Sequence, residues 1–211
     1  YEYDFLDYTK ISEDKIKWMV SNKFVTLTKE NYDAIKTASK GLHIKLATVY
    51  ETEFINEIAS FTLDKDDLIL LFKSSDFSHN GKLDVIQKID DNIIISNPEI
   101  AELVCYLLPE DKATPLRYEV FEAMFAANPS LEKKIKTLVA NIEKFSDEQL
   151  QGFVEKFGED YARVFVNQNK PVFANKDYNK ILFGILKSRN LISSFSENPE
   201  KGEIKVVANY Q

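Results

Sequence analysis

The sequence predicts a mostly α fold: an irregular helical array that ends in a C-terminal β-hairpin resembling the wing of a winged-helix domain. One helix opening, made of an apolar residue, a capping residue, an acidic first turn and an apolar stripe, occurs at residues 11–20, 63–72 and 145–154. The 211 residues include only six Gly and six Pro, which favours long regular elements over a turn-rich β sandwich. Two β-prone stretches, 191–196 and 203–208, predict the hairpin.

The first helices are predicted from their caps. Ser12 and Thr28 precede apolar stripes, and a hydroxyl at the N-cap accepts a hydrogen bond from a backbone N–H of the first turn. Gly41 is predicted to end the second helix, because Gly adopts the left-handed conformation that follows a helix. Residues 42–59 predict either one helix broken near Glu51 or two short helices.

The second helix opening is predicted to begin at Asp64, with Asp66 and Asp67 in the first turn. Carboxylates there stabilise the positive end of the helix dipole, which explains them better than a metal site does. Asn80–Gly81 is a turn signal in isolation, but the apolar residues that follow it predict a helix start. Residues 93–96 are predicted to be an apolar connector before a helix that opens at Pro98.

The last part of the array is predicted to contain four helices. They open at Pro115, near Leu131, at Ser146 and at Lys176, and the last runs to Arg189. Ser146 and Gln149 have the spacing of a capping box. The three openings lie 52 and 82 residues apart, which is not a fixed period. A degenerate helical repeat and the chance reuse of helix caps both stay open.

The domain organisation is predicted from charge and from helix order. We expect an acidic helical subdomain at residues 1–92 and a C-terminal helical subdomain with the hairpin at 93–211, or one continuous array. Residues 1–131 carry a net charge of −9, whereas residues 132–211 carry +2. An acidic surface repels nucleic-acid phosphates, so any such contact is expected in the C-terminal part.

Catalytic signatures are absent from the sequence. It contains no phosphate-binding glycine loop, HExxH or CxxC motif, and His43 and His79 lie far apart, so we expect no enzyme activity, no metal site and no cofactor. Cys105 lies in an apolar stripe and is expected to pack in the core. With one Cys, no signal peptide and no long apolar run, the chain is expected to be cytoplasmic and to have no membrane contact.

The helix and hairpin near the C-terminus are the sharpest functional candidate. A helix followed by a two-stranded wing is how winged-helix domains end, so basic side chains there are candidates for nucleic-acid contact. These candidates are Lys176, Lys180, Lys187, Arg189 and Lys201. The weak positive charge of this part makes a solvated basic face, or a wing that contacts protein, the favoured interpretation.

Several of these stretches also resemble a known family. The openings at 11–20 and 63–72, the stretch Ile95–Leu103 and the residues Leu191–Ser194 before the hairpin resemble the C-terminal helical region of YobI-like P-loop NTPases, which are large bacterial proteins. The resemblance implies that the chain is an accessory portion whose nucleotide-binding motif lies upstream. It transfers no NTPase residue, because that motif has no match here.

The first functional hypothesis is therefore a non-catalytic protein-interaction or sensor module of a larger bacterial NTPase. Its expected partner is another protein or the upstream NTPase domain of the same chain. The alternative is a nucleic-acid-binding regulator that uses the winged-helix-like element.

Overall fold

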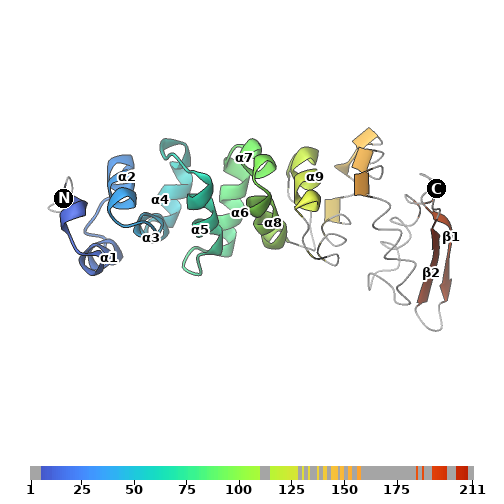
Figure 1. Ribbon diagram of the computed structural model, residues 1–211, viewed down its shortest axis with the longest axis horizontal. Coiled ribbons are helices and arrows are strands. Elements are labelled where there is room, and N and C mark those ends of the chain that lie inside the picture. The colour runs from blue at the N-terminus through green and yellow to red at the C-terminus, as the bar shows by residue number, and fades with distance from the viewer. Residues whose placement is uncertain are drawn as a thin grey trace. The chain divides into compact units, whose positions relative to one another are not determined.

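The structure is a computed structural model of the whole chain (Figure 1). It describes residues 6–109 and 115–127, single residues and short stretches between 130 and 157, Gly184 and Lys187, and two strands, 192–198 and 203–208. The chain divides into two compact units, Tyr1–Leu107 and Leu108–Gln211. This division falls after the helix that opens at Pro98, whereas the sequence predicts one before it.

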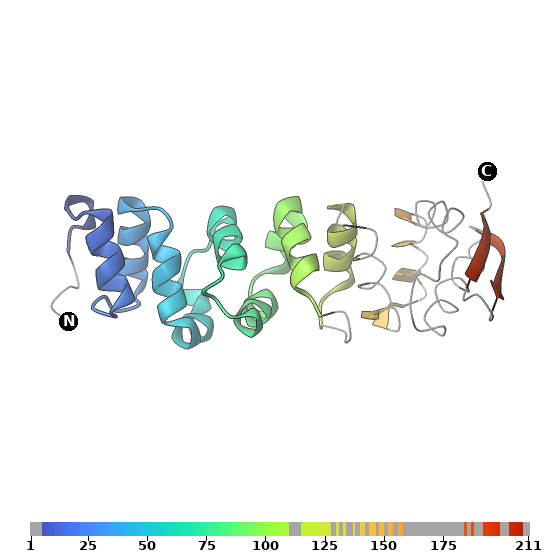
Figure 2. The same cartoon turned by 90° about the horizontal axis from the view of Figure 1, so that it is seen from below.

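The first unit is helical throughout its described part, which confirms the prediction of a mostly α fold. In Figures 1 and 2 its helices follow one another in chain order, each beside the next. Its elements are η1 Tyr8–Lys10, α1 Glu13–Ser21, α2 Lys29–Ala38, α3 Leu42–Val49, α4 Glu51–Asn56, η2 Ile58–Ser60, α5 Lys65–Lys73, α6 His79–Lys88, α7 Asp91–Ser96 and α8 Pro98–Leu107. Both α1 and α2 pack on α3, α4 packs on α6, and α8 packs against α5, α6 and α7.

The helices α1, α2 and α5 begin at the N-cap residues that the sequence predicts. The side chains of Ser12, Thr28 and Asp64 each accept a hydrogen bond from the backbone N–H three residues later. Ser78 caps α6 in the same way, so Asn80–Gly81 lies in the first turn of a helix, as predicted. Gly41 has a φ of 107° and lies between the end of α2 and the start of α3. The region after it forms two short helices that meet at Tyr50.

Two local predictions are wrong. Residues 93–96 belong to α7 instead of a connector, because the Asp90 side chain accepts from the Asn92 N–H at 2.9 Å and starts a helix there. The helix predicted to open at Pro115 is α9, Tyr118–Ala126, and it begins three residues later because Arg117 adopts an extended conformation.

The core of the first unit is built around aromatic rings. Phe54 lies at the centre, with ring centroids 5.2 Å from Phe61, 6.3 Å from Phe77 and 6.4 Å from Tyr32. Phe54 and Tyr32 are completely buried. Cys105 is also buried, as the sequence predicts. These rings come from α2, α4 and the segments on either side of α5, so they hold successive helix pairs together.

Gly81 of α6 lies close against its neighbours. A Cβ atom added there would lie 2.8 Å from the Phe77 ring and 2.9 Å from the Glu51 carboxyl carbon. Glu51 is fixed in place, since its carboxylate accepts from both the N–H and the hydroxyl of Ser78 at 2.6 and 2.8 Å. The site therefore has no room for a side chain.

Gly81→Ala is expected to destabilise the protein by about 1–3 kcal/mol, because the added methyl group must displace the Phe77 ring or the Glu51 cap. The measurement is far-UV circular dichroism during urea unfolding. Gly152→Ala is the matched control, because Gly152 is also helical and nothing lies within 4 Å of its added Cβ. The control is expected to be neutral or slightly stabilising, and equal losses in both variants would contradict the steric account.

The second unit contains α9 and the two strands. Val120, Phe121, Met124 and Phe125 of α9 are buried. The predicted capping box of Ser146 and Gln149 is present, with reciprocal hydrogen bonds of 3.0 and 3.1 Å. Lys133 is buried, and its ammonium group donates to the Leu108 carbonyl at 3.1 Å.

The predicted C-terminal strands are β1, Ile192–Asn198, and β2, Glu203–Ala208, which pair antiparallel in a sheet of their own. Their interpretation as the wing of a winged-helix domain is wrong. A wing is defined by the helix-turn-helix unit on which it folds, and the fold that the described residues build is an array of short helices. The helix predicted at 176–189 lies outside the described residues, apart from Gly184 and Lys187.

Candidate functional site

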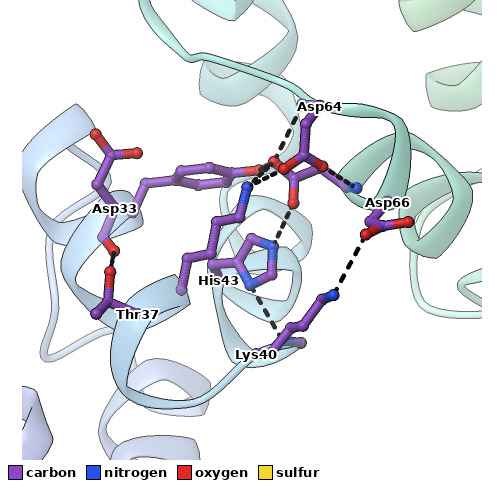
Figure 3. Close-up of polar contacts among 10 residues, drawn as sticks. Asp33, Thr37, Lys40, His43, Asp64 and Asp66 are labelled. Carbon is purple, nitrogen blue, oxygen red and sulfur yellow. Dashed lines mark hydrogen bonds and ion pairs between the residues drawn. The ribbon is translucent and has the colours of Figure 1, made fainter.

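A group of polar side chains, centred on the buried Asp67, connects three helices of the first unit (Figure 3). It consists of Tyr32 and Lys36 from α2, His43 from α3, and Asp64 and Asp67 at the start of α5, and we call it the Asp67 network. These side chains bring together segments that are far apart in the sequence. The network is the most concentrated polar chemistry that the structure describes.

Asp67 is completely buried, and its carboxylate is compensated on both oxygens. Its Oδ1 lies 2.8 Å from His43 Nε2, while its Oδ2 accepts from the Tyr32 hydroxyl at 3.1 Å and from Lys36 Nζ at 2.9 Å. A buried carboxylate is tolerated only with such partners, because removing it from water costs several kcal/mol. The three donors therefore fix α2 and α3 against α5.

The tautomer of His43 follows from its two neighbours. The Gly41 backbone N–H donates to Nδ1 at 3.1 Å, so this nitrogen carries no proton. The hydrogen is therefore on Nε2, which donates to Asp67. Both ring nitrogens of this buried histidine are engaged, and the unusual backbone of Gly41 supplies one of the partners.

The network is continuous with the cap of α5. The Asp64 side chain accepts from the Asp67 N–H at 2.9 Å, and the Asp64 N–H donates back to the Asp67 carboxylate at 3.4 Å. Lys36 also bridges to Asp64, at 2.6 Å. Asp66 points away from the network to an exposed ion pair with Lys40 at 3.4 Å. The sequence interpretation of all three acids as first-turn dipole residues is therefore incomplete for Asp67.

The charge states follow from these contacts. Burial raises the pKa of Asp67, but the hydrogen bonds from His43 and Lys36 outweigh it and lower the pKa to about 2. Burial and the Asp67 carboxylate raise the pKa of the Tyr32 hydroxyl. For Lys36, burial lowers the pKa, but the hydrogen bonds to Asp64 and Asp67 outweigh burial, so the pKa is raised above its ordinary value. Near neutral pH, Asp67 is thus ionised, Lys36 is positive and Tyr32 is protonated.

His43 and Asp67 are the residue types of a catalytic dyad, but the histidine ring has no nitrogen free to act on a substrate. A general base needs a free ring nitrogen facing a nucleophile or a substrate. In His43, one nitrogen is held by Asp67 and the other by a backbone amide, and the ring is fully buried. Within the described residues no cluster of three metal-ligating side chains occurs. The Asp67 network is a structural tie between helices.

The network predicts a pH dependence of stability. The pKa of Asp67 is about 2 in the folded protein, against an ordinary value of 3.8. Because the folded pKa is the lower one, the stabilisation is present above about pH 4 and is lost as the pH falls towards 2, and it amounts to about 2 kcal/mol. Urea unfolding at several pH values in this window measures it. Asp67→Asn is expected to remove this component of the slope; an unchanged slope would contradict the assignment.

A weak sequence signal for this site exists. Asp67 stands directly before Leu68 and shares its helix face with Leu68, Leu71 and Phe72, which are buried. A charged residue that interrupts an apolar stripe is expected to be buried with a partner. His43 likewise lies on the buried face of α3. The pattern identifies each residue as buried, but it does not identify the two as partners.

The second unit has a shallow surface hollow. Its lining includes Tyr118 and Glu122 of α9, and Ser146, Glu148 and Lys156. Lys156 pairs with Glu122, so two of the three charged side chains neutralise each other. Burial and the neighbouring Glu122 raise the pKa of the Tyr118 hydroxyl. The hollow therefore offers little net charge or depth to a ligand.

An exposed aromatic pair lies at the end of α1. Trp18 is 52% exposed and Phe24 is 39% exposed, and their ring centroids are 5.1 Å apart. We call these two residues the aromatic pair. Aromatic side chains of this size are usually buried in a folded protein, so a pair that stays in solvent is a candidate contact surface.

The aromatic pair is held by the way in which α1 ends. Lys23 has a φ of 57°, the Phe24 N–H donates to the Met19 carbonyl at 2.9 Å, and the Lys23 N–H donates to the Val20 carbonyl at 3.1 Å. These two bonds define a Schellman motif, in which the residue after the left-handed position packs against the last helical turn. Phe24 makes that contact with Trp18. The Schellman motif therefore places the Phe24 ring against the Trp18 ring.

The candidate nucleic-acid residues are mostly outside the described part of the chain. Lys176, Lys180, Arg189 and Lys201 lie there, while Lys187 is helical and exposed. The proposed contact to nucleic acid stays a prediction. Of the two histidines, His43 is in the Asp67 network and His79 is exposed at the start of α6.

Comparison with known proteins finds one significant similarity among curated sequences. Over 192 residues the chain is 28% identical to "Uncharacterized membrane protein YobI" of Bacillus subtilis (strain 168). The match covers 90% of this chain but only 16% of that protein. No protein-family model matches the chain, and no solved structure matches it.

These findings correct three expectations from the sequence. The similarity to YobI is found, but the assignment to the C-terminal region of a P-loop NTPase is wrong, since the relative is described as an uncharacterised membrane protein. The same description contradicts the expected cytoplasmic location and the expected absence of membrane contact. In the part of the chain that the structure describes, no helix has the length and apolar character to cross a bilayer.

Proposed function

We propose that this chain is a non-catalytic interaction module, a helical array that presents a fixed surface to a partner. The aromatic pair carries the proposal. Tryptophan is over-represented among the residues that contribute most to binding energy at interfaces, and it contributes most where its position is fixed before binding. Trp18 is half exposed, so a partner can reach it. It is also held against Phe24 by the Schellman motif before any partner binds.

The state of the buried polar residues supports a non-catalytic role. The Asp67 network uses every hydrogen-bonding position of the His43 ring and both oxygens of Asp67 for contacts between helices. Such contacts fix the helices relative to one another, and a fixed array keeps its surface side chains in a constant arrangement. The buried polar contacts therefore stabilise the arrangement of helices that carries the surface side chains.

The similarity to YobI supports a location for this module at a membrane. YobI is described as a membrane protein, and the matched region is a small part of it. By this similarity, we place the module in a protein that works at a membrane, where it contacts a partner.

Site-specific photo-crosslinking tests the proposal. A photoreactive phenylalanine analogue replaces Trp18 in the full chain expressed in its native cells, and it replaces Tyr106 in a control. Tyr106 is suitable because it is an aromatic residue of α8 with 49% exposure. Position 18 is expected to give a discrete adduct that position 106 does not give. Equal or absent adducts at the two positions would remove the aromatic pair as the binding surface.

A further inference from the structure

The charge around the aromatic pair differs from that of the rest of the first unit. Between Lys15 and Lys29 the chain has four lysines and no Asp or Glu, although residues 1–131 together carry a net charge of −9. Lys15, Lys17 and Lys23 are exposed, and Lys15 precedes Trp18 by three residues on α1. The aromatic pair is thus located in a short basic stretch of an acidic array.

The lysine beside Phe24 is also held in place. Lys23 is the left-handed residue of the Schellman motif, and its ammonium group lies 5.2 Å from the centre of the Tyr50 ring. The Tyr50 hydroxyl donates to the Val25 carbonyl at 2.9 Å, which fixes the ring against the loop. The ammonium group of Lys23 is therefore held over the Tyr50 ring, and Lys23 itself directly precedes Phe24 in the chain. We call Lys15, Trp18, Lys23 and Phe24 the aromatic–lysine surface.

We infer that the aromatic–lysine surface binds the headgroup region of an anionic lipid bilayer. This inference rests on the proposed function and names the partner of the same surface. Tryptophan and phenylalanine rings partition into the boundary between headgroups and acyl chains, and adjacent lysines are attracted to anionic headgroups. The surface combines both chemistries within ten residues of the chain.

The acidic remainder of the first unit sets the geometry of this contact. Glu13 and Asp14 begin α1, and they are exposed one turn before Trp18. Carboxylates are repelled by an anionic surface, so only the C-terminal end of α1 and the loop after it approach the lipid. The contact is consequently small, reversible and sensitive to salt.

Trp18 makes the inference directly measurable, because it is the single tryptophan of the chain. The full 211-residue chain is titrated with vesicles of phosphatidylcholine alone, or of phosphatidylcholine with one-third phosphatidylglycerol. With the anionic vesicles, Trp18 emission is expected to shift to the blue and to be quenched by brominated acyl chains. We expect binding about tenfold or more tighter than to neutral vesicles, and a marked loss at high salt.

Matched variants separate the two chemistries. Phe24→Ala and the double variant Lys15→Gln with Lys23→Gln are each expected to weaken binding by about tenfold. Tyr106→Ala and the double variant Lys40→Gln with Lys65→Gln change other exposed residues of the first unit, and they are expected to leave binding unchanged. Far-UV circular dichroism confirms that each variant is folded.

Two results would overturn the inference: no blue shift with anionic vesicles at low salt, or equal effects of the test and control variants. A protein adduct at position 18 together with absent vesicle binding would leave the interaction module standing and remove the lipid as its partner. Absence of both the adduct and the vesicle binding would remove both proposals.

Discussion

Asp67→Asn is expected to lower the free energy of unfolding by about 3 kcal/mol, because breaking a buried ion pair leaves its partner charge uncompensated. Lys36 would keep only its bond to Asp64, and an amide cannot accept from His43, Tyr32 and Lys36 on both of its heavy atoms. Urea unfolding of the full chain, followed by Trp18 fluorescence and far-UV circular dichroism, measures the loss.

Asp66→Asn is the matched control for this change. Asp66 is the neighbouring residue in the same first turn, but it is exposed and pairs with exposed Lys40 at 3.4 Å. Surface pairs of this kind contribute less than about 1 kcal/mol. If the two variants lose the same stability, the effect belongs to the charge of the first turn and not to the Asp67 network.

Phe54→Ala is expected to lower the free energy of unfolding by about 3–5 kcal/mol, the usual loss for a buried phenylalanine. Phe54 is completely buried, and it contacts Tyr32, Phe61 and Phe77 through stacked, tilted and edge-to-face rings. Its removal leaves a cavity that the three neighbouring rings, which belong to three different segments, cannot all move to fill. The shift of the urea midpoint measures the loss.

Phe24→Ala makes the same chemical change at an exposed position. Phe24 is 39% exposed and contacts Trp18 at a helix end, so the expected loss is about 1 kcal/mol. A loss at position 24 as large as that at position 54 would contradict the distinction between the buried rings and the aromatic pair.

The helices could be predicted from the sequence because their causes are local. Ser12, Thr28 and Asp64 accept hydrogen bonds from residues three positions away, and the apolar stripes behind them follow the period of the helix. The error at residues 93–96 has the same origin. Three consecutive isoleucines suggested a connector, while the cap at Asp90 decided the structure and only Ile94 is buried.

The candidate site could not be predicted because its causes are not local. His43 and Asp67 meet across 24 residues of chain, and their pairing depends on how α3 packs on α5. The role of Trp18 depends on the left-handed backbone conformation of Lys23. Lysine rarely adopts this conformation, and the neighbouring residues in the sequence do not predict it. The chemistry of both sites thus arises from packing and backbone conformation.

The Asp67 network also limits how the first unit can open. A single buried carboxylate is bonded to both α2 and α3, so neither helix separates from α5 without exposing a charge. Opening of α2, α3 or α5 alone is therefore less favourable than an opening in which the three helices unfold together. Backbone amides of α2, α3 and α5 are therefore expected to exchange with deuterium at a common slow rate, whereas the short α7, which has no bond to the network among the described contacts, exchanges faster.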